Sequence, residues 1–343
     1  MSISELVKSE LRGKRVAITG SCGTVGQELL RLIAEAEPES VIGIDHDEGG
    51  LFFLGLQYRD DERFSFKLAN IRDLDSLRER LDGIDLVLHT AALKHVPLCE
   101  DAPLEAVHTN IIGTQNVLNA SRKSGVKRLL FTSTDKAVNP TNVMGTSKLM
   151  AERLVTAFAG TSDMIASTTR FGNVLGSSGS VLPVFRQQIA AGGPVTVTDP
   201  EMTRFIMTLT DASSLVLESA FLGGPGDVVI TKMPIANIND LAHVMVQELA
   251  PMYGRDPDDI EIKVIGPRPG EKRYEELMND EEVRRSFDVG DFLVVRPALF
   301  SLEEPANSIG RPDRPYNSHH EVALSRDELR DFLNTNGLLK AQD

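Results

Sequence analysis

A glycine-rich turn between an apolar strand and an amphipathic helix is the feature that most constrains the fold. Residues 15–19 (RVAIT) form a short apolar run, and glycines then recur at every third position, at Gly20, Gly23 and Gly26. Over residues 27–36 the apolar side chains recur at helical spacing. A strand that passes through such a turn into a helix is typical of the first unit of a parallel βαβ arrangement.

Further apolar runs continue this alternation of strands and helices. We expect strands within residues 41–45, 84–92 and 126–133, and a helix with one apolar face around residues 107–118. Such alternation is typical of a parallel sheet whose two faces are covered by helices that connect the strands in right-handed crossovers. The predicted fold class is therefore α/β, a doubly wound parallel sheet of the Rossmann type.

The length of 343 residues leaves room for about two structural units. After Gly172 the sequence changes from alternating apolar segments to loops that are rich in Gly, Ser and Pro. We therefore expect a dinucleotide-binding Rossmann domain over residues 1–172, with an N-terminal extension over residues 1–14. Residues 173–343 are expected to form mainly a smaller substrate-binding region, with some segments returning to the Rossmann sheet.

The glycine positions have a specific use at the start of a helix. Glycine permits a tight turn in which backbone N–H groups approach a pyrophosphate, whose charge the positive end of the helix stabilises. Asp45 ends the second strand 19 residues after Gly26, where its carboxylate can accept hydrogen bonds from the adenosine ribose. Because a carboxylate repels the 2′-phosphate of NADP, the pattern predicts NAD. The alternative is a tight turn that binds no ligand, and Asp45 argues against it.

The residues predicted to contact this cofactor lie in the turn, in the first helical turn and at strand ends. They are Gly20, Gly23, Thr24, Val25, Gly26 and Asp45. Asn70 and Ile71 follow another short segment, and they either contact the adenine or have only a structural role.

Net charge argues against several classes of partner. The 36 Lys and Arg residues against 50 Asp and Glu residues give a net charge of −14, which disfavours nucleic acids and anionic membrane surfaces as partners. An anionic substrate therefore needs a local basic pocket. No apolar run approaches the roughly 18 residues of a membrane-spanning helix, and the charged N-terminus is unlike a signal peptide. We expect a cytoplasmic protein with a small-molecule substrate and no membrane span.

The two cysteines, Cys22 and Cys99, form no CxxC motif, and the histidines belong to no cluster with metal-ligand spacing. No metal site is therefore predicted, and a reducing compartment is expected. Cys22 lies inside the glycine turn, where we expect a small residue and not a nucleophile.

Residues 133–148 (STDKAVNPTNVMGTSK) follow directly on a predicted buried strand, at the position where open α/β sheets have their active sites. With this segment the sequence resembles the extended short-chain dehydrogenase/reductase superfamily and, within it, the 4,6-dehydratases that act on UDP-N-acetylglucosamine. The resemblance covers nearly the whole chain. The other motifs that carry it are TGSCGTVG at 19–26, HTAALKHVP at 89–97, RFGNVLGSSGSVLPVF at 170–185, TDPEMTRF at 198–205 and RPGEK at 268–272.

One position departs from the superfamily pattern. The usual Tyr-x-x-x-Lys is Met144-x-x-x-Lys148 in this chain, which keeps both residues on one helical face but loses the phenol. Methionine cannot act as an acid or a base. The sequence is similar to a subset of the UDP-N-acetylglucosamine 4,6-dehydratases in which Met stands beside a Thr-Asp-Lys segment. The resemblance therefore implies that Asp135 and Lys136 carry more of the proton chemistry.

The resemblance also implies a mechanism. Tightly bound NAD takes a hydride from sugar C4 and returns it to C6, so the cofactor is recycled. Neutral Lys136 removes the C5 proton, and protonated Asp135 delivers a proton to the departing C6 hydroxyl. Thr134 is expected to hydrogen-bond the C4 oxygen, and Lys148 to bind the nicotinamide ribose. Which group removes the C4 hydroxyl proton is left open, with Asp135 acting through Thr134 as the first hypothesis.

The remaining motifs are matched to cofactor and substrate contacts through the same resemblance. Ala91 and Ala92 are expected beside the cofactor, and Lys94 either lines the sugar pocket or is an ordinary solvated lysine. Arg268 is expected to contact phosphate and Glu271 the uridine ribose. Asn173 and the loop at 176–180, which includes Ser180, are expected to bind the nucleotide of the substrate. For Arg204, substrate binding and a helix-end contact to carbonyl groups are left as alternatives.

Three functions are consistent with these residues. The first is a 4,6-dehydratase, with or without epimerisation at C5. The second is a nucleotide-sugar 4-epimerase, which needs the same oxidation at C4 but no acid at C6. The third is a non-catalytic NAD-binding scaffold that has lost its tyrosine. Asp135 and Lys136 favour the first, unless they form only an exposed surface ion pair. The resemblance further implies a homodimer or higher homo-oligomer built through helices around 104–122 and 145–160.

Overall fold

The computed structural model describes residues 3–177, 179–268, 270–299 and 303–340, so Ser178 of the expected nucleotide loop lies outside the described residues. The chain divides into two compact units. The first comprises the described residues of Met1–Phe171, Thr210–Lys232 and Met278–Pro315. The second comprises those of Gly172–Leu209, Met233–Leu277 and Tyr316–Asp343.

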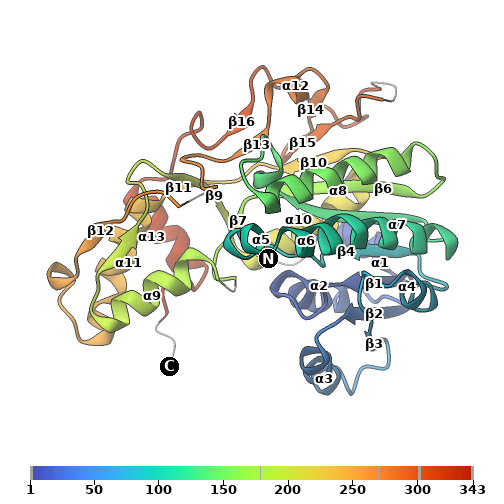
Figure 1. The fold of residues 1–343 in the computed structure, drawn as a ribbon, viewed down its shortest axis with the longest axis horizontal. Coiled ribbons are helices and arrows are strands. Elements are labelled where there is room, and N and C mark those ends of the chain that lie inside the picture. The colour runs from blue at the N-terminus through green and yellow to red at the C-terminus, as the bar shows by residue number, and fades with distance from the viewer. Residues whose placement is uncertain (1–2, 178, 269, 300–302, 341–343) are drawn as a thin grey trace. The chain divides into compact units, whose positions relative to one another are not determined.

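A nine-stranded sheet forms the centre of the first unit, in the order β14-β15-β10-β6-β5-β4-β1-β2-β3 (Figure 1). Seven neighbouring strands of this sheet run parallel, in the order β10-β6-β5-β4-β1-β2-β3. Strand β15 is antiparallel to both β10 and β14. The bounds are β1 Arg15–Thr19, β2 Ser40–Asp45, β3 Phe64–Leu68, β4 Leu86–His89, β5 Arg128–Thr134, β6 Ile165–Phe171, β10 Val228–Thr231, β14 Ser286–Asp288 and β15 Phe292–Val295. The prediction of a doubly wound α/β fold is confirmed.

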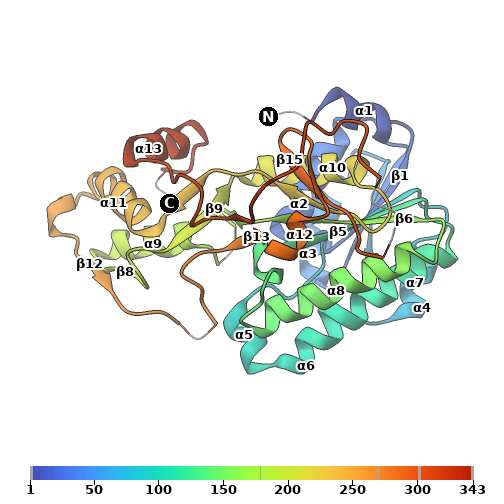
Figure 2. The same ribbon diagram turned by 90° about the horizontal axis from the view of Figure 1, so that it is seen from above.

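Helices cover both faces of this sheet, as Figure 2 shows. On one face α4, α7 and α8 bury residues such as Leu77, Val117 and Val155 against the strands. On the other face α1, α2 and α10 pack through residues such as Leu11 and Leu29. The bounds are α1 Glu5–Leu11, α2 Thr24–Ala34, α3 Glu48–Gln57, α4 Leu74–Arg80, α5 Val96–Asp101, α6 Pro103–Ala106, α7 Thr114–Lys123, α8 Val143–Ala159, α10 Leu209–Leu222 and α12 Asp280–Val283.

Two expected elements differ from the structure in ways that shape the site. The strand expected over 84–92 ends at His89, because residues 90–93 leave the sheet and line a cavity. The helix expected around 107–118 is not regular: a π-helical segment, Val107–Gly113, precedes α7. A π-helix has i→i+5 hydrogen bonds and is frequent at functional sites.

The second unit has its own core and its own small sheets. Apolar residues of α9 (Val181–Ala191), α11 (Ile238–Leu249) and α13 (Arg326–Thr335) form this core. Three short sheets have the orders β11-β9-β7, β12-β8 and β13-β16. Their bounds are β7 Asn173–Val174, β8 Val195–Val197, β9 Thr203–Met207, β11 Ile235–Asn237, β12 Ile262–Val264, β13 Glu276–Met278 and β16 Tyr316–Asn317. In the described part of the chain, no helix has the length and apolar character that crossing a membrane requires.

Candidate active site

Backbone geometry at the glycine turn explains why side chains are excluded there. Gly20 has φ of +77°, and a Cβ on it would lie 2.7 Å from the backbone nitrogen of Ala91. A Cβ on Gly26 would collide with the carbonyl oxygen of Gly20. Gly23 is the N-cap of α2 and, having no side chain, cannot cap the helix itself. The N–H groups at the start of α2 therefore suit an anionic ligand.

A cavity of about 750 Å³ lies beside this turn, within the size range of small-molecule and cofactor sites. Seven of the residues predicted to contact the cofactor line it: Gly20, Gly23, Asp45, Asn70, Ile71, Ala91 and Ala92. Thr24, Val25 and Gly26 form the first turn of α2 and are not part of the lining.

Asp45 lies where a ribose contact is expected. One carboxylate oxygen, Oδ2, accepts from the Cys22 N–H at 2.9 Å, and Oδ1 accepts from the His46 and Asp47 N–H groups at 2.8 and 3.2 Å. These bonds orient the carboxylate at the end of β2. Burial, together with Asp45 and Asp47, raises the pKa of the Cys22 thiol to about 12. Cys22 is therefore protonated at neutral pH and is not a nucleophile.

Sequence reasoning missed a contact between residues that line the cavity. The Arg72 guanidinium Nη2 lies 2.6 Å from the Glu105 carboxylate and donates to Thr109 Oγ1, also at 2.6 Å. All three residues line the cavity. Arg72 follows the predicted pair Asn70 and Ile71, but no local pattern pairs it with residues that lie 33 and 37 positions later.

The Thr-Asp-Lys segment lies at the carboxyl end of β5, where a 3₁₀ turn spans Asp135–Ala137. Asp135 is fully buried, and its Oδ1 accepts from Thr134 Oγ1 at 2.7 Å and from Lys136 Nζ at 2.9 Å. Its Oδ2 is also buried and has no hydrogen-bond partner among the described residues. The Lys136 side chain is 24% exposed. Because the aspartate is buried, the alternative of an exposed surface ion pair is wrong.

Lys148 of α8 contacts β5 just before the Thr-Asp-Lys segment. Its Nζ donates to the Thr132 carbonyl oxygen at 2.7 Å and lies 4.1 Å from the centre of the Phe131 ring. Burial lowers the pKa of Lys148 to about 7, although the Glu152 carboxylate opposes this shift. Burial and the nearby lysine also lower the pKa of His89 to about 3. That histidine is neutral, and its ring nitrogens contact the hydroxyls of two threonines, Thr19 and Thr114.

Met144 occupies the first turn of α8 and is 4% exposed. It packs in a small apolar cluster with Cys99 and Ala106, so the structure gives it a packing role. Two polar residues that sequence reasoning missed lie nearby. Asn110, in the π-helical segment, accepts from the Leu93 N–H at 2.8 Å and donates to Ser147 Oγ at 2.9 Å. This pair connects the cavity lining with α8.

Met144→Leu is expected to leave turnover within about twofold and stability within about 1.5 kcal/mol, because the substitution nearly conserves volume in an apolar cluster. Steady-state kinetics and urea unfolding measure the two quantities. A loss of turnover above tenfold with unchanged stability would show that the thioether takes part in the reaction.

The expected substrate residues are divided between the units. Lys94 belongs to the first unit. The residue as a whole is exposed, but its side-chain amine is partly desolvated by neighbouring atoms, which lowers the pKa of Lys94. Asn173, Ser180, Arg268 and Glu271 belong to the second unit. Asn173 begins β7, and Ser180 is the N-cap of α9. The Glu271 carboxylate accepts from the Arg268 N–H at 3.1 Å, which closes a tight turn.

Arg204 lies in strand β9 and is 5% exposed, so the helix-end alternative is wrong. Its guanidinium donates to the carbonyl oxygens of Thr203 and Lys272 at 2.8 Å. It also lies 3.6 Å from the Glu275 carboxylate and 4.0 Å from that of Glu271. Arg204 therefore orders the end of the RPGEK motif and the residues that directly follow it.

Sequence comparisons relate the chain to known proteins. The model of a family described as polysaccharide biosynthesis protein matches residues 16–297. A protein of Methanocaldococcus jannaschii described as an uncharacterized membrane protein is 45% identical over 94% of this chain and 96% of its own length. The capsular polysaccharide biosynthesis protein CapD of Staphylococcus aureus is 40% identical over 81% of this chain, and the match covers 47% of CapD. A UDP-glucose 4-epimerase of Rickettsia canadensis is 35% identical, over 94% of this chain and 96% of its own.

Solved structures agree with this relationship. Pen from Bacillus thuringiensis superposes with a TM-score of 0.87 at 38% identity, over 95% of this chain and 98% of Pen. DesIV, a dTDP-glucose 4,6-dehydratase from Streptomyces venezuelae solved with NAD and TYD bound, has the same fold. Its TM-score is 0.68 at 23% identity, over 75% of this chain and 86% of DesIV. The chain therefore belongs to the polysaccharide biosynthesis protein family and has the Rossmann fold of the extended short-chain dehydrogenase/reductases.

Proposed function

We propose that this protein is an NAD-dependent UDP-N-acetylglucosamine 4,6-dehydratase. The observation that carries the proposal is the buried Asp135, whose Oδ1 contacts both Thr134 and Lys136 at the end of β5. Dehydration across C5 and C6 needs one group to remove a proton and another to deliver one. Asp135 and Lys136 form such a pair, and membership of a polysaccharide biosynthesis family suits a sugar-nucleotide substrate.

The residues that would hold NAD are those of the cavity beside the glycine turn, with Asp45 toward the adenosine ribose. When bound, the cofactor supplies oxidation at C4 and the return of the hydride to C6. Lys148 is the candidate contact to the nicotinamide ribose, and Thr134 to the C4 oxygen. We propose that the cofactor stays bound between turnovers, because a hydride that is taken from C4 and returned to C6 leaves the cofactor in its starting oxidation state.

Proton transfer within the Asp135–Lys136 pair prepares both groups for the elimination. Moving one proton from Lys136 Nζ to Asp135 gives a neutral amine and a carboxylic acid without changing the total charge. The amine then takes the C5 proton. The acid protonates the departing C6 hydroxyl, which leaves as water. These two steps leave Lys136 protonated and Asp135 ionised, so they regenerate the starting pair without a further transfer between the two residues.

A UDP-sugar 4-epimerase is the second candidate function. The similarity to the Rickettsia canadensis protein, described as a UDP-glucose 4-epimerase, favours it. Epimerisation needs oxidation and reduction at C4 but no acid at C6. The third hypothesis, a non-catalytic scaffold, offers no reason to bury a carboxylate next to a lysine at a strand end.

Proton NMR of UDP-N-acetylglucosamine incubated with the protein in deuterated water tests the proposal. A new C6 methyl signal, with deuterium at C5, is expected, and the ring couplings report whether C5 is also inverted. Inversion at C4 without a methyl signal would support the epimerase. Mass spectrometry of the dinucleotide released on denaturation checks for NAD, and NADP in its place would contradict the assignment to Asp45.

We further propose a homo-oligomer built through the helices around 104–122 and 145–160. Large apolar side chains are exposed on these and the neighbouring segments: Leu98, Leu104, Val107, Ile112 and Met150. Sedimentation velocity is expected to give a mass of at least twice 37.5 kDa, and a single 37.5 kDa species would contradict the proposal. We also propose a cytoplasmic location. Cell fractionation tests it, and recovery of the protein in the membrane fraction would contradict it; the test is needed because a relative is described as a membrane protein.

A further inference from the structure

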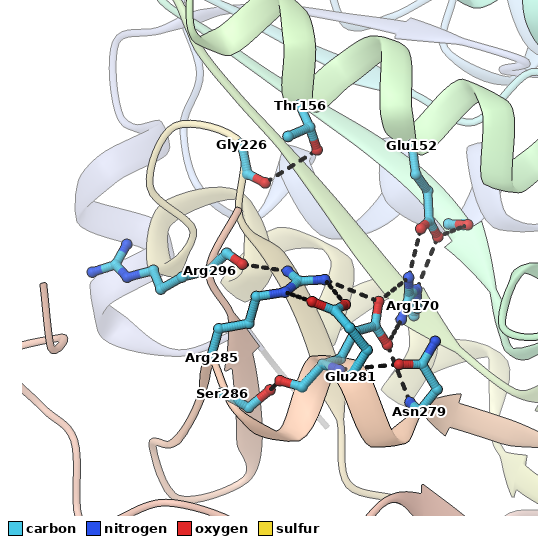
Figure 3. A network of polar contacts seen from close by, with 11 residues as sticks. Glu152, Thr156, Arg170, Gly226, Asn279, Glu281, Arg285, Ser286 and Arg296 are labelled. Carbon is cyan, nitrogen blue, oxygen red and sulfur yellow. Dashed lines mark hydrogen bonds and ion pairs between the residues drawn. The ribbon is translucent and has the colours of Figure 1, made fainter. Parts of the chain in front are cut away.

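A buried carboxylate lies one helical turn beyond Lys148. Glu152 of α8 is 2% exposed, and its Oε1 accepts from Ser133 Oγ at 2.5 Å and from Arg170 Nε at 2.9 Å. Its Oε2 accepts from Arg170 Nη2 at 2.7 Å. Figure 3 shows Glu152 and Arg170 facing each other below the helix. Ser133 directly precedes the Thr-Asp-Lys segment.

Arg170 connects this carboxylate to a distant part of the chain. It lies in β6, is 1% exposed, and pairs with both oxygens of Glu282 at 2.9 Å. Burial opposes its charge, but the two glutamates raise the pKa of Arg170, so the guanidinium stays protonated. Glu282 also completes a capping box with Asn279 at the start of α12. Three segments, α8, β6 and α12, thus meet at one guanidinium.

Strand pairing explains what Glu152 holds together. Ser133 of β5 and Arg170 of β6 are partners in the strand register, so Glu152 contacts both members of one pair. Its contact with Ser133 connects the last residues of β5 to the helix that carries Lys148. A buried ion network contributes little net stability compared with well-packed apolar side chains, so its presence here suggests that it specifies geometry.

We propose that Ser133 and Glu152 are positioning residues, which hold the end of β5 against α8 and so keep Thr134, Asp135 and Lys136 in a fixed arrangement relative to Lys148. Neither residue needs to touch the substrate. The inference rests on the proposed function for its effect on turnover. Its structural part, the restraint on the end of β5, stands without it.

Ser133→Ala tests the proposal, because it removes the hydroxyl donor and leaves the contacts between Glu152 and Arg170 in place. We expect kcat to fall about 10- to 100-fold with KM within about twofold, the size of effect that misplacement of reacting groups causes. Amide hydrogen exchange at Lys136 and Val138 is expected to quicken about tenfold, since both N–H groups bond within the Thr-Asp-Lys turn.

Ser219→Ala is the matched control. The Ser219 hydroxyl is buried and pairs with the hydroxyl of Thr169 in β6 at 3.1 Å, but it has no contact with the Thr-Asp-Lys segment. We expect this variant to keep the native kcat and the native exchange rates at Lys136 and Val138. Equal effects from both serine variants would overturn the proposal, because any lost buried hydroxyl would then act alike.

The two readouts separate the inference from the proposed function. If the native protein turns over substrate and Ser133→Ala matches it in kcat, the positioning role is overturned even if exchange quickens. If the native protein forms no 4-keto-6-deoxy product, the dehydratase proposal fails, and exchange alone decides whether Ser133 restrains the end of β5. Unchanged exchange in Ser133→Ala overturns that restraint in either case.

Discussion

Lys136→Ala is expected to lower kcat for dehydration by about 10²- to 10⁴-fold, the contribution typical of a positioned general base. Lys136 directly follows the end of β5, its side chain is partly exposed, and its Nζ contacts the buried carboxylate of Asp135. Without Lys136, the Thr-Asp-Lys segment has no amine that can take the C5 proton, so deuterium incorporation at C5 should fall together with kcat. Proton NMR in deuterated water measures both product formation and deuterium content.

Asp135→Asn should give a similar loss of product but a different exchange pattern. The amide keeps the size of the carboxylic acid but cannot deliver a proton to the C6 oxygen. In this variant Lys136 can lose its proton only to solvent, so C5 exchange is expected to continue at a reduced rate, and recovered substrate carries deuterium while the methyl signal is absent. Lys123→Ala, an exposed position at the end of α7, is the control and should retain native activity. For the first of these two variants, a native kcat for dehydration in Lys136→Ala would rule out Lys136 as the base that takes the C5 proton.

Arg170→Met has the largest expected effect on stability. The arginine is 1% exposed between Glu152 and Glu282, so its loss leaves two carboxylates buried and close to each other. Removing one partner of a buried ion pair costs about 3–5 kcal/mol in the free energy of unfolding. Urea unfolding measures the change. Arg59→Met removes an exposed arginine paired with Asp60 and is expected to cost less than about 1 kcal/mol. Equal losses for both variants would contradict the account.

The loss in Arg170→Met should depend on pH. Burial alone would raise the pKa of Glu282. The opposite effect of Arg170 outweighs burial, so the pKa of Glu282 lies below its ordinary value. The ionised Glu282 therefore stabilises the native protein above the unfolded-state pKa of about 4.3, and this contribution is lost as the pH falls through the lower native value. Without Arg170, burial favours the protonated acid. The stability difference between the two proteins should thus be largest at neutral pH and shrink in acid.

Local patterns were enough to predict the parts of the fold that depend on neighbouring residues. The strand at 15–19, the glycine turn and Asp45 lie within one βαβ unit, where spacing alone implies geometry. Strand β6 has no such signal, because its buried residues include Ser167, Thr168 and Thr169, which lack an apolar pattern. Strand β3 lies at the sheet edge and is only partly buried.

Contacts between residues far apart in the chain could not be predicted in this way. Arg170 and Glu282 are 112 positions apart, and Arg72 and Glu105 are 33 apart. Charged residues usually indicate a solvated surface, so a pattern gives no sign that Arg170 is buried. The Thr-Asp-Lys segment was recognised as a motif, but only the structure shows that Asp135 is buried and contacts both of its neighbours through one oxygen.

The late strands of the sheet have a consequence for how the chain folds during synthesis. When Phe171 leaves the ribosome, β6 has an unpaired edge, because its neighbour β10 is made only at Val228–Thr231. Glu282 and β15 are synthesised later still. Arg170 therefore lacks its second carboxylate partner, Glu282, until more than 100 further residues have been added. At about 5–20 residues per second the exposed edge persists for several seconds. We therefore expect nascent chains that end near Phe171 to be protease-sensitive and to bind chaperones that recognise unpaired strands.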